Sequence, residues 1–413
     1  ESAQSSRSLA QNLADRAAYF LTLIAIGAGV ITFVVWTLLA PTVGFALERT
    51  VTVLVIACPH ALGLAIPLVI AISTTLAARN GLLVRERTAL ERAKDLDMIV
   101  FDKTGTLTKG EHGVVAVHAV EEVDETSALQ FAAVVEANSE HVIARAIVLS
   151  AQERGLQIPE ASEFRALPGR GVEAEIEGHK LSVGGPKLVE SQDITVPDAL
   201  VRKVEPDMQA GRTVVYLVVD GNAIAAISLA DVIRPESYEA VRELKHEGMK
   251  IAMLTGDSEE VARTVASELG IDEYYAEVLP EDKAKMIQNL KNRGMRVAMV
   301  GDGVNDAPAL LTADIGIAIG AGTDVAVEAG SIVLVRNDPR DIVKIIRLSK
   351  SSYSKMVQNL AWATGYNVIA IPLAAGVLAG YGIILPPAVG AILMSLSTVI
   401  VAVNSQFLRR LKM

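Results

Sequence analysis

Only one cysteine, Cys58, occurs among the 413 residues, which excludes a disulfide bond within the chain. Positive charge is also scarce, because 38 lysine and arginine residues stand against 48 aspartate and glutamate residues. The resulting net charge of −10 argues against the basic surface that nucleic acids require, so no nucleic-acid partner is expected. No secretory signal peptide, internal repeat or low-complexity tract is evident.

Apolar residues are distributed unevenly. Hydrophobic residues make up 51% of the chain and the mean hydropathy is +0.37, yet the middle of the sequence is rich in charge. Segments 19–40 and 51–78 contain no Asp, Glu, Lys or Arg, and each is long enough to cross a bilayer. A third such segment, 356–408, has room for two crossings, with Gly380–Gly382 and Pro386–Pro387 supplying the turn. We therefore expect four membrane-spanning helices.

Basic residues follow these apolar regions directly. They are Arg79, Arg85, Arg87, Arg92 and Lys94 after the second segment, and Arg409, Arg410 and Lys412 after the last. The positive-inside rule places both ends on the cytoplasmic side. The sequence therefore predicts a multi-pass integral membrane protein, in contact with membrane lipid and expected in the cell membrane, with a cytoplasmic charged centre.

The charged centre contains a seven-residue stretch, 102–108, that reads DKTGTLT. The preceding segment, 96–101, is short, apolar and partly β-branched, which predicts a buried strand. Asp102 would then lie at the carboxyl end of a strand, where open α/β sheets place their chemistry. Such an aspartate suits a nucleophile that accepts a phosphoryl group while Mg²⁺ neutralises charge. An ordinary strand-to-loop turn would explain Asp-x-Thr-Gly alone, but the full stretch is far more specific.

Two later strands are predicted to end in polar turns. Segment 250–254 runs into Thr255-Gly256-Asp257, segment 296–300 runs into GDGVND (301–306), and a helical run with Pro280 and Lys283 lies between them. Each feature alone could be a turn or a surface lysine. Together they suggest that Thr255 holds a phosphate oxygen, Lys283 neutralises charge and Asp302 ligates Mg²⁺. Asn305 and Asp306 could support the metal or phosphate shell.

These elements resemble the haloacid dehalogenase-like superfamily, and DKTGTLT with TGD and GDGVNDAPAL is similar to the catalytic domain of P-type ATPases. The resemblance implies a Rossmann-type α/β phosphorylation domain, an inserted α+β nucleotide-binding domain and an α-helical transmembrane bundle. The implied catalytic residues are Asp102, Lys103, Thr104, Thr255, Gly256, Asp257, Lys283, Asn305 and Asp306, with Mg²⁺ on Asp102, Thr104 and Asp302. The expected boundaries are a linker helix at 1–18, two transmembrane helices and a basic extension at 19–94, the phosphorylation domain at 95–115 and 231–350, the nucleotide-binding domain at 116–230, and two further transmembrane helices at 351–413.

Within the expected insertion, Glu136 and Ser139-Glu140-His141 are predicted to lie in a helical stretch, and Gly169-Arg170-Gly171 follows later. In isolation these signals are weak. They resemble the nucleotide-binding residues of heavy-metal-transporting P-type ATPases, where a Glu and a His contact adenine and a Gly-x-Gly loop lies under the nucleotide. The resemblance implies that Glu136, His141, Gly169 and Gly171 bind ATP. Val142 stands where that family usually has a proline, which removes a backbone restraint beside His141.

The second apolar segment contains Cys58-Pro59-His60. Proline cannot donate a backbone hydrogen bond, so we expect a kinked helix and a freed carbonyl at Val55. A thiolate with an intramembrane imidazole suits copper, silver or zinc better than Na⁺, K⁺ or Ca²⁺. A proline kink with a buried Cys and a carbonyl-bonded His is the alternative. The triplet is similar to the Cys-Pro-His branch of the heavy-metal ATPases, which is associated with copper and silver.

Further ligands for the transported ion are expected in the last two spans. Tyr366-Asn367 and the segment Met394–Thr398 resemble motifs of the same branch. Helical spacing cannot place all the candidates of the second segment on one face, so Met394 with Ser397 or Thr398 is the expected inward pair. The expected ion ligands are Cys58, His60, Met394, Asn367, Ser397 and Thr398.

No Thr-Gly-Glu occurs in the sequence, although P-type ATPases use that loop of an actuator domain to remove the phosphate. The polar start of the chain resembles the linker that follows the actuator domain. We therefore expect the C-terminal portion of a pump, lacking the actuator domain and first transmembrane helices and unable to complete turnover.

The predicted function is ATP-driven export of Cu⁺, Cu²⁺ or Ag⁺ through an aspartyl phosphate at Asp102, with Zn²⁺ not excluded by ligand chemistry. A membrane-tethered phosphatase and a non-pumping metal sensor are the alternatives.

Overall fold

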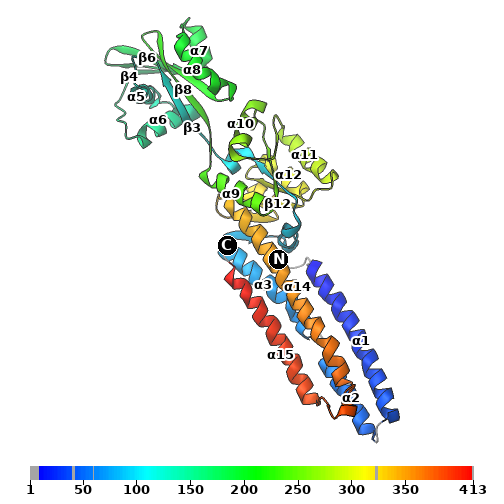
Figure 1. Cartoon of the computed structure of the whole chain (residues 1–413). Helices are drawn as coiled ribbons and strands as arrows, with labels where there is room; N and C mark the ends of the chain where they lie inside the picture. The colour runs from blue at the N-terminus through cyan, green and yellow to red at the C-terminus, as the bar shows by residue number, and fades with distance from the viewer. Residues whose placement is uncertain (1–8, 40–41, 59, 321–323, 412–413) are drawn as a thin grey trace. The chain divides into compact units, whose positions relative to one another are not determined.

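The computed structural model describes residues 9–39, 42–58, 60–320 and 324–411 (Figure 1). Its contacts divide the chain into two units. One comprises the chain up to Asp97 together with Gly294–Ala298 and the part from Leu310 onward, and the other comprises Met98–Arg293 and Met299–Ala309. Pro59, Lys412 and the first eight residues of the expected linker lie outside the described residues.

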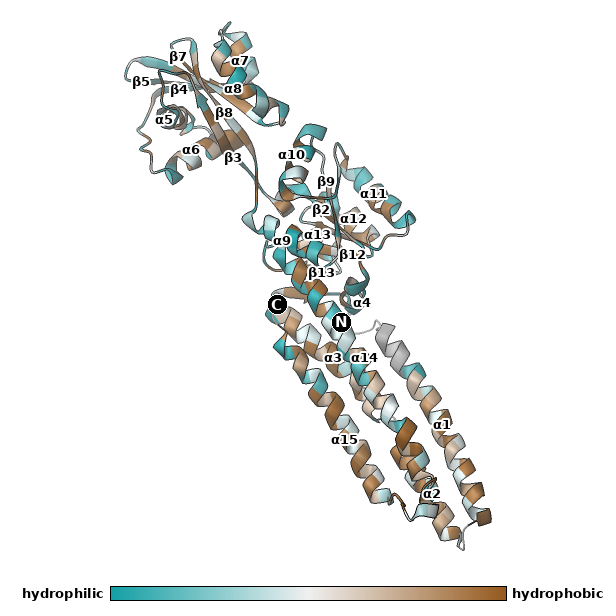
Figure 2. Cartoon of the chain, viewed as in Figure 1, coloured by the Kyte–Doolittle hydropathy of each residue, from teal (hydrophilic) through white to brown (hydrophobic). Residues whose placement is uncertain are grey.

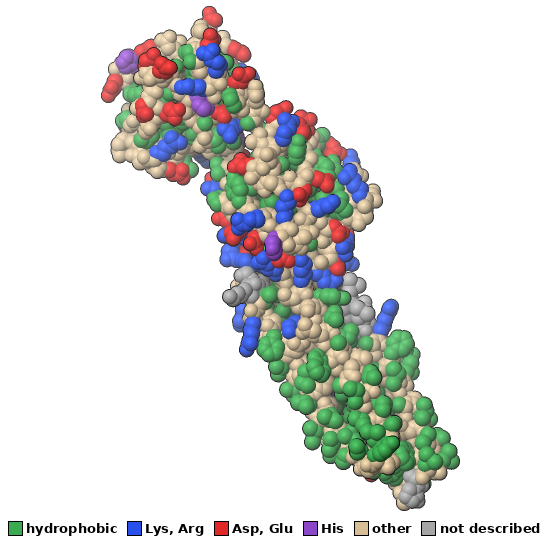
Figure 3. All heavy atoms as spheres, viewed as in Figure 1, with side chains coloured by type: hydrophobic (Ala, Val, Ile, Leu, Met, Phe, Trp, Pro, Cys, Tyr) green, Lys and Arg blue, Asp and Glu red, His purple; other side chains and the backbone are tan. Residues whose placement is uncertain are grey.

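Long apolar helices form most of the first unit. They are α1 (Leu9–Leu39), α2 (Val43–Ile56), α3 (His60–Arg79), α14 (Arg340–Ala374) and α15 (Pro387–Gln406). Small and aliphatic side chains of α3, α14 and α15, among them Ala61, Ala65, Ala363 and Val401, form a buried seam between these helices. Their outward faces carry exposed hydrophobic side chains, as the surface in Figure 3 and the colouring in Figure 2 show. That pattern suits helices surrounded by lipid.

Three helical segments are long and apolar enough to cross a membrane: Asp15–Leu39, Val43–Arg79 and Pro387–Arg410. The second contains α2 and α3, which are separate helices, so the single helix expected over 51–78 is broken near its Cys-Pro-His triplet. Helix α14 is not among the three, because its charge-free half carries polar Gln358, Asn359 and Asn367. A fourth span therefore stays a prediction. The expected turn is present, since η5 (Ala379–Tyr381) lies between α14 and α15.

A seven-stranded sheet has the strand order β1-β13-β12-β11-β2-β9-β10. Its strands are β1 (Leu82–Val84), β2 (Met98–Asp102), β9 (Lys250–Leu254), β10 (Glu273–Tyr275), β11 (Val297–Gly301), β12 (Ile315–Ile319) and β13 (Ile332–Leu334). β2 pairs in parallel with β9, and β9 with β10. Helices α9 (Pro235–His246), α10 (Glu259–Leu269), α11 (Pro280–Asn292), α12 (Ala307–Thr312) and α13 (Asp324–Ala329) connect the strands after β8. This alternation makes the doubly wound α/β fold that the sequence predicts.

A six-stranded antiparallel sheet, ordered β3-β8-β7-β6-β5-β4, interrupts that fold. Its strands are β3 (Thr108–Ala119), β4 (Ser162–Leu167), β5 (Gly171–Ile176), β6 (His179–Gly184), β7 (Thr213–Val219) and β8 (Asn222–Ile233). Strand β7 shows why the domain has two cores. Val215 and Leu217 pack with α5 (Glu125–Glu136) and α6 (Val142–Glu153), whereas Val214, Tyr216 and Val218 pack with α7 (Pro186–Ser191) and α8 (Asp198–Gln209).

Strands β3 and β8 carry the chain into and out of this inserted domain. They pair from Thr108 opposite Ile233 to Ala119 opposite Ala225. The expected domain boundaries at 115/116 and 230/231 therefore fall inside these two strands.

Candidate active site

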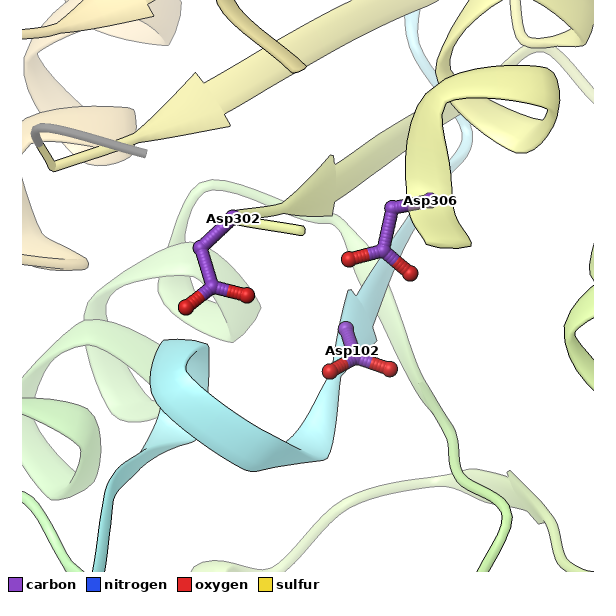
Figure 4. A group of neighbouring side chains, drawn as sticks. All are labelled: Asp102, Asp302 and Asp306. Carbon is purple, nitrogen blue, oxygen red and sulfur yellow. The ribbon is translucent and has the colours of Figure 1, made fainter. Parts of the chain in front are cut away.

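Three carboxylates meet at the carboxyl ends of two strands. Asp102 is the last residue of β2, Asp302 follows β11, and Asp306 ends the short helix η4 (Val304–Asp306). One carboxylate oxygen from each lies within 4.8 Å of one from each of the others (Figure 4). The sequence predicted that Asp102 and Asp302 converge, with Asp306 as a possible support one short turn further on, and the structure brings the three residues together.

Lys283 supplies positive charge to this cluster from α11. Pro280 begins that helix and Glu281 and Asp282 occupy its first turn, where the missing proline N–H and the negative charges favour a helix start. The Lys283 ammonium group donates hydrogen bonds to Asp102 Oδ1 at 2.5 Å and to Asp306 Oδ1 at 2.7 Å. Both bonds are buried. The predicted role of Lys283 as a neutralising cation therefore has a geometric basis.

Crowding of the carboxylates changes their proton affinity. Burial is the main reason that the pKa of Asp102 rises to about 7, with the negative charge of Asp306 adding to the rise and Lys283 opposing it. Burial and Asp306 also raise the pKa of Asp302. One ammonium group does not balance three neighbouring carboxylates, of which Asp102 and Asp306 are buried and Asp302 is half-buried, so the cluster favours a further cation.

The donor set fits Mg²⁺, a hard cation that prefers carboxylate oxygen. Gly105 keeps space open beside Asp302, because a Cβ at this position would lie 2.0 Å from Asp302 Oδ2. Its φ of +76° also favours glycine. Asp102 and Asp302 would hold the ion. Thr104, the third predicted ligand, lies in the same loop with its side chain exposed.

Lys103 forms a second ion-pair group, beside the loop that follows Asp102. Its ammonium group lies 3.1 Å from Asp231 Oδ2 and 2.9 Å from Asp257 Oδ2. Thr255 Oγ1 donates to Asp257 at 2.7 Å, so its hydroxyl already has a partner. Burial acts to raise the pKa of Asp257, but hydrogen bonds from Lys103 and Thr255 outweigh it and the pKa is lowered. Lys103, Thr255 and Asp257 thus support the loop as one connected group.

Three residues near the loop were missed by the sequence reasoning. Asp231 accepts hydrogen bonds from Lys103 and from the backbone N–H of Gly110, and Arg234 donates to the Gly105 carbonyl. The Thr106 hydroxyl is buried and has no hydrogen-bond partner among the described residues. Asp231 and Arg234 reach the loop through the pairing of β3 with β8, which no local spacing reveals. Thr106 lies within the DKTGTLT motif, so the motif was the signal that could have identified it.

Two predicted residues take less part in this group. Gly256 and the side chain of Asn305 are exposed at their turns. Their proposed roles in the phosphate or metal shell stay predictions.

The four predicted nucleotide-binding residues line one hollow of about 430 Å³ in the inserted domain. Glu136 ends α5 and is buried, which raises its pKa to about 7 although a hydrogen bond with Ser139 opposes the rise. Gly171 must be glycine, because its φ is +150° and a Cβ would lie 2.1 Å from the Val183 carbonyl oxygen. Gly169 has a φ of +71° with open space around its Cα.

The helical stretch expected around His141 is wrong in detail. α5 ends at Glu136 and α6 begins at Val142, so His141 lies between two helices. It caps α6, with its Nδ1 accepting a hydrogen bond from the Ile143 N–H at 3.3 Å. Val142 is therefore the first helical residue, the position at which proline is best tolerated.

The membrane helix breaks at the Cys-Pro-His triplet. The Val55 carbonyl, expected to be free, accepts a hydrogen bond from the Cys58 N–H at 3.3 Å, so that expectation is wrong. This bond joins residues three apart rather than the four apart of an α-helix, so Cys58 pairs with the Val55 carbonyl. The His60 N–H donates to the Cys58 carbonyl. The Ile56 carbonyl accepts instead from the Tyr366 hydroxyl of α14 at 2.8 Å. Tyr366 thus pairs the backbone group that the break exposes.

The predicted ion ligands are not equally buried. Asn367 and Ser397 are buried, and the Asn367 carbonyl oxygen Oδ1 has no hydrogen-bond partner within the described part of the chain. Cys58, Met394 and Thr398 are half-buried. His60 is exposed at the start of α3, so the structure does not place it with the buried members. The inward pair expected on α15 stays a prediction, and so does His60, which lacks burial to support it.

Residues 96–314 match the family model of the haloacid dehalogenase-like hydrolases. The chain is similar to the copper-exporting P-type ATPase B of Archaeoglobus fulgidus, with 56% identity over 98% of this chain and 58% of that protein. It is 45% identical to the copper-exporting P-type ATPase B of Enterococcus hirae, over 98% of this chain and 54% of that one.

Among solved structures, a zinc-transporting PIB-type ATPase in the E2·Pi state superposes with a TM-score of 0.80 at 34% identity. The match covers 95% of this chain and 63% of that one. The chain therefore spans a little more than half the length of these two curated relatives.

Proposed function

The chain belongs to the haloacid dehalogenase-like hydrolases and, within them, to the heavy-metal-transporting P-type ATPases, and we propose that its whole protein uses ATP to export a soft metal ion. The copper-exporting relatives favour copper as that ion. It is a multi-pass membrane protein with cytoplasmic catalytic domains. The observation that carries the proposal is the group of Asp102, Asp302 and Asp306 around Lys283.

The phosphoryl transfer follows from the positions of these side chains. An Asp102 carboxylate oxygen attacks the γ-phosphorus of ATP, the bond from that phosphorus to the β–γ bridging oxygen breaks, and ADP leaves. Lys283 holds positive charge beside Asp102, which favours the ionised nucleophile. Mg²⁺, when bound by Asp102 and Asp302, supplies the charge neutralisation that phosphoryl transfer requires. The acyl phosphate remains on Asp102.

ATP binding is assigned to the hollow lined by Glu136, His141, Gly169 and Gly171. Its glycines support the assignment, because positions that lack a Cβ atom let a flat ligand approach the backbone. A volume of about 430 Å³ is in the range of small-molecule sites.

The transported ion is assigned to the break between α2 and α3. Cys58 provides a thiolate, Met394 provides a thioether, and Asn367 Oδ1 is a buried oxygen that has no hydrogen-bond partner among the described residues. Two sulfur ligands favour Cu⁺ or Ag⁺ over hard cations. Ser397 and Thr398 lie on the neighbouring turn of α15, and His60 is an additional candidate.

Acid-quenched labelling with γ-labelled ATP and Mg²⁺ tests the proposal. We expect a hydroxylamine-labile label on the purified chain that increases with one of Cu⁺, Cu²⁺, Ag⁺ or Zn²⁺. Asp102→Asn should abolish the label, and Cys58→Ser should weaken its metal dependence. Undiminished labelling of the Asp102 variant would refute the nucleophile. Hydrolysis of small phosphate esters without any label from ATP would favour a membrane-tethered phosphatase.

A further inference from the structure

A hollow of about 200 Å³ lies between the C-terminal half of α3 and the N-terminal half of α14, in the same unit as both. Its walls come from these two helices, from Val84, and from α4 (Arg87–Arg92) with the turn η2 (Ala93–Asp95) that follows. None of the residues assigned above to phosphoryl transfer, nucleotide or transported ion contributes to it.

The floor of the hollow is apolar and continues into the membrane helices. Ile70, Leu90 and Met356 line it. Met356 also belongs to the buried cluster that joins α3 to α14, together with Ile66 and Val69. A ligand seated here would therefore meet an apolar floor that is backed by the buried cluster between α3 and α14.

Three basic side chains, Arg87, Arg92 and Lys94, line the hollow together with two acidic ones, Glu91 and Asp95, so its formal charge is positive. Arg87 is half-buried and Arg92 is exposed, and the side chain of neither makes a hydrogen bond or ion pair within the described residues. Lys94 differs, because its ammonium group lies 2.6 Å from Asp95 and 4.1 Å from the centre of the Tyr353 ring. Two guanidinium groups thus remain able to bind an anion. Guanidinium groups suit phosphate because they can donate two parallel hydrogen bonds.

A buried hydroxyl in the wall also lacks a partner. Ser352 is only 5% exposed, lines the hollow, and its Oγ has no hydrogen-bond partner in the described part of the chain. Ser349, one turn earlier on the same helix, accepts a hydrogen bond from the Lys94 N–H at 2.9 Å. An unpaired buried hydroxyl costs free energy unless a ligand or water pairs with it, so Ser352 points to an occupant with a polar group.

We propose that this hollow binds one anionic phospholipid. Arg87, Arg92 and Ser352 bind the phosphate of its headgroup, and an acyl chain lies along Ile70 and Met356. Anionic lipids are attracted to basic segments on the cytoplasmic face, which is where the positive-inside rule places Arg79 and the following α4. A free phosphate compound shares the headgroup chemistry but gains nothing from the apolar floor.

Lipid binding to the full 413-residue chain in detergent tests the site, with native mass spectrometry as the readout. We expect one molecule of dioleoylphosphatidylglycerol to bind at least tenfold more tightly than dioleoylphosphatidylcholine. The double variant Arg87→Gln with Arg92→Gln should lose this preference. A matched control, Arg409→Gln with Arg410→Gln, removes two charges from another membrane-end segment and should retain it.

Ser352→Ala tests the hollow without removing a charged side chain. It deletes an unpaired hydroxyl, so folding should be unaffected, while affinity for the anionic lipid should fall several-fold. Glycerol 3-phosphate at the same concentration separates the two sources of phosphate and should not displace the lipid.

Three outcomes would overturn the proposal. Equal losses in the two arginine double variants would mean that surface charge alone attracts the lipid. Unchanged affinity in Ser352→Ala together with the Arg87/Arg92 variant would remove the hollow from the binding. Displacement of the lipid by glycerol 3-phosphate would identify a soluble anion as the occupant.

Discussion

Lys283 places one ammonium group between Asp102, the proposed nucleophile, and Asp306, and no other described cation donates a hydrogen bond to either carboxylate. Its removal would leave buried negative charges facing one another. The pKa of Asp102, already about 7, would then rise further, and the ionised nucleophile would become scarcer at neutral pH.

Lys283→Met is therefore expected to slow the labelling of Asp102 by about 10- to 100-fold, the size expected for a lost charged hydrogen bond of about 1.5–3 kcal/mol. The control is Lys285→Met on the same helix, where the lysine is exposed and pairs with Asp282. Rapid-quench labelling at pH 7 measures both. Similar rates in the two variants would show that Lys283 only stabilises the helix.

Glu136 makes folding depend on pH. An unfolded glutamate has its ordinary pKa of 4.5, whereas burial raises the folded pKa to about 7. Between these values the folded chain keeps a proton that the unfolded chain has lost, so stability falls as pH rises through this window and stays low above it. Glu136→Gln should therefore stabilise the chain at pH 8, by up to about 3 kcal/mol, and by progressively less toward pH 5.

The melting temperature of the inserted domain from pH 5 to 8 checks this expectation. Glu140→Gln is the matched control, since Glu140 is exposed in the turn beside His141. A pH-independent difference between Glu136→Gln and the parent chain would contradict the elevated pKa.

At the scale of single elements, the loop after β2 requires Gly105 for two reasons. Its φ of +76° disfavours a side chain, and a Cβ would collide with Asp302 Oδ2. Gly294 also has a positive φ, of +83°, but a Cβ added there would have nothing within 4 Å among the described residues. Both alanine variants should lose about 1 kcal/mol of stability from backbone strain.

Only Gly105→Ala should also lose phosphorylation, because its methyl group displaces Asp302. We expect at least a 100-fold lower labelling rate for Gly105→Ala and a near-normal rate for Gly294→Ala, both measured by acid quench. Normal labelling of Gly105→Ala would show that Asp302 can move away without consequence.

The broken membrane helix depends on one hydroxyl from its neighbour. Tyr366→Phe leaves the Ile56 carbonyl without its 2.8 Å hydrogen bond, in surroundings where water is scarce. We expect a loss of about 1–2 kcal/mol and a looser break beside Cys58. Because Cys58 is the only cysteine, its rate of alkylation by a maleimide reports the loosening and should rise several-fold.

Tyr381→Phe serves as the control for this variant. Tyr381 lies in the turn between α14 and α15 and is 84% exposed. Equal alkylation rates in the two variants would mean that the Tyr366 hydrogen bond does not hold the break.

Local pattern explains which elements the sequence could predict. β9 occupies the predicted residues 250–254, and β2 and β11 lie within two residues of their predicted bounds, because apolar runs and the turns after them are local signals. Asp231 and Arg234 could not be found in this way, since the register of β3 on β8 brings them to the loop from more than 120 residues away. The partner of the freed carbonyl was equally non-local, because Tyr366 lies on another helix.

At the scale of the whole molecule, the inserted domain has what a folding unit needs. Its six-stranded sheet carries a separate hydrophobic core on each face. Thr108 pairs with Ile233, so the two ends of the segment 108–233 lie side by side. Every residue that lines the nucleotide hollow lies within this segment. These features predict that the segment folds and binds ATP when excised.

We expect residues 108–233 to unfold in one cooperative transition and to bind ATP with an affinity close to that of the full chain, as measured by calorimetry. The control is the shorter segment 120–221, which lacks β3 and β8. Because β8 lies between β3 and β7, its loss strips one side of β7 and opens the core formed by Ala225 and Ile227. The shorter segment should therefore be unfolded. A folded 108–233 segment that fails to bind ATP, while the full chain binds it, would show that residues outside the hollow complete the nucleotide site.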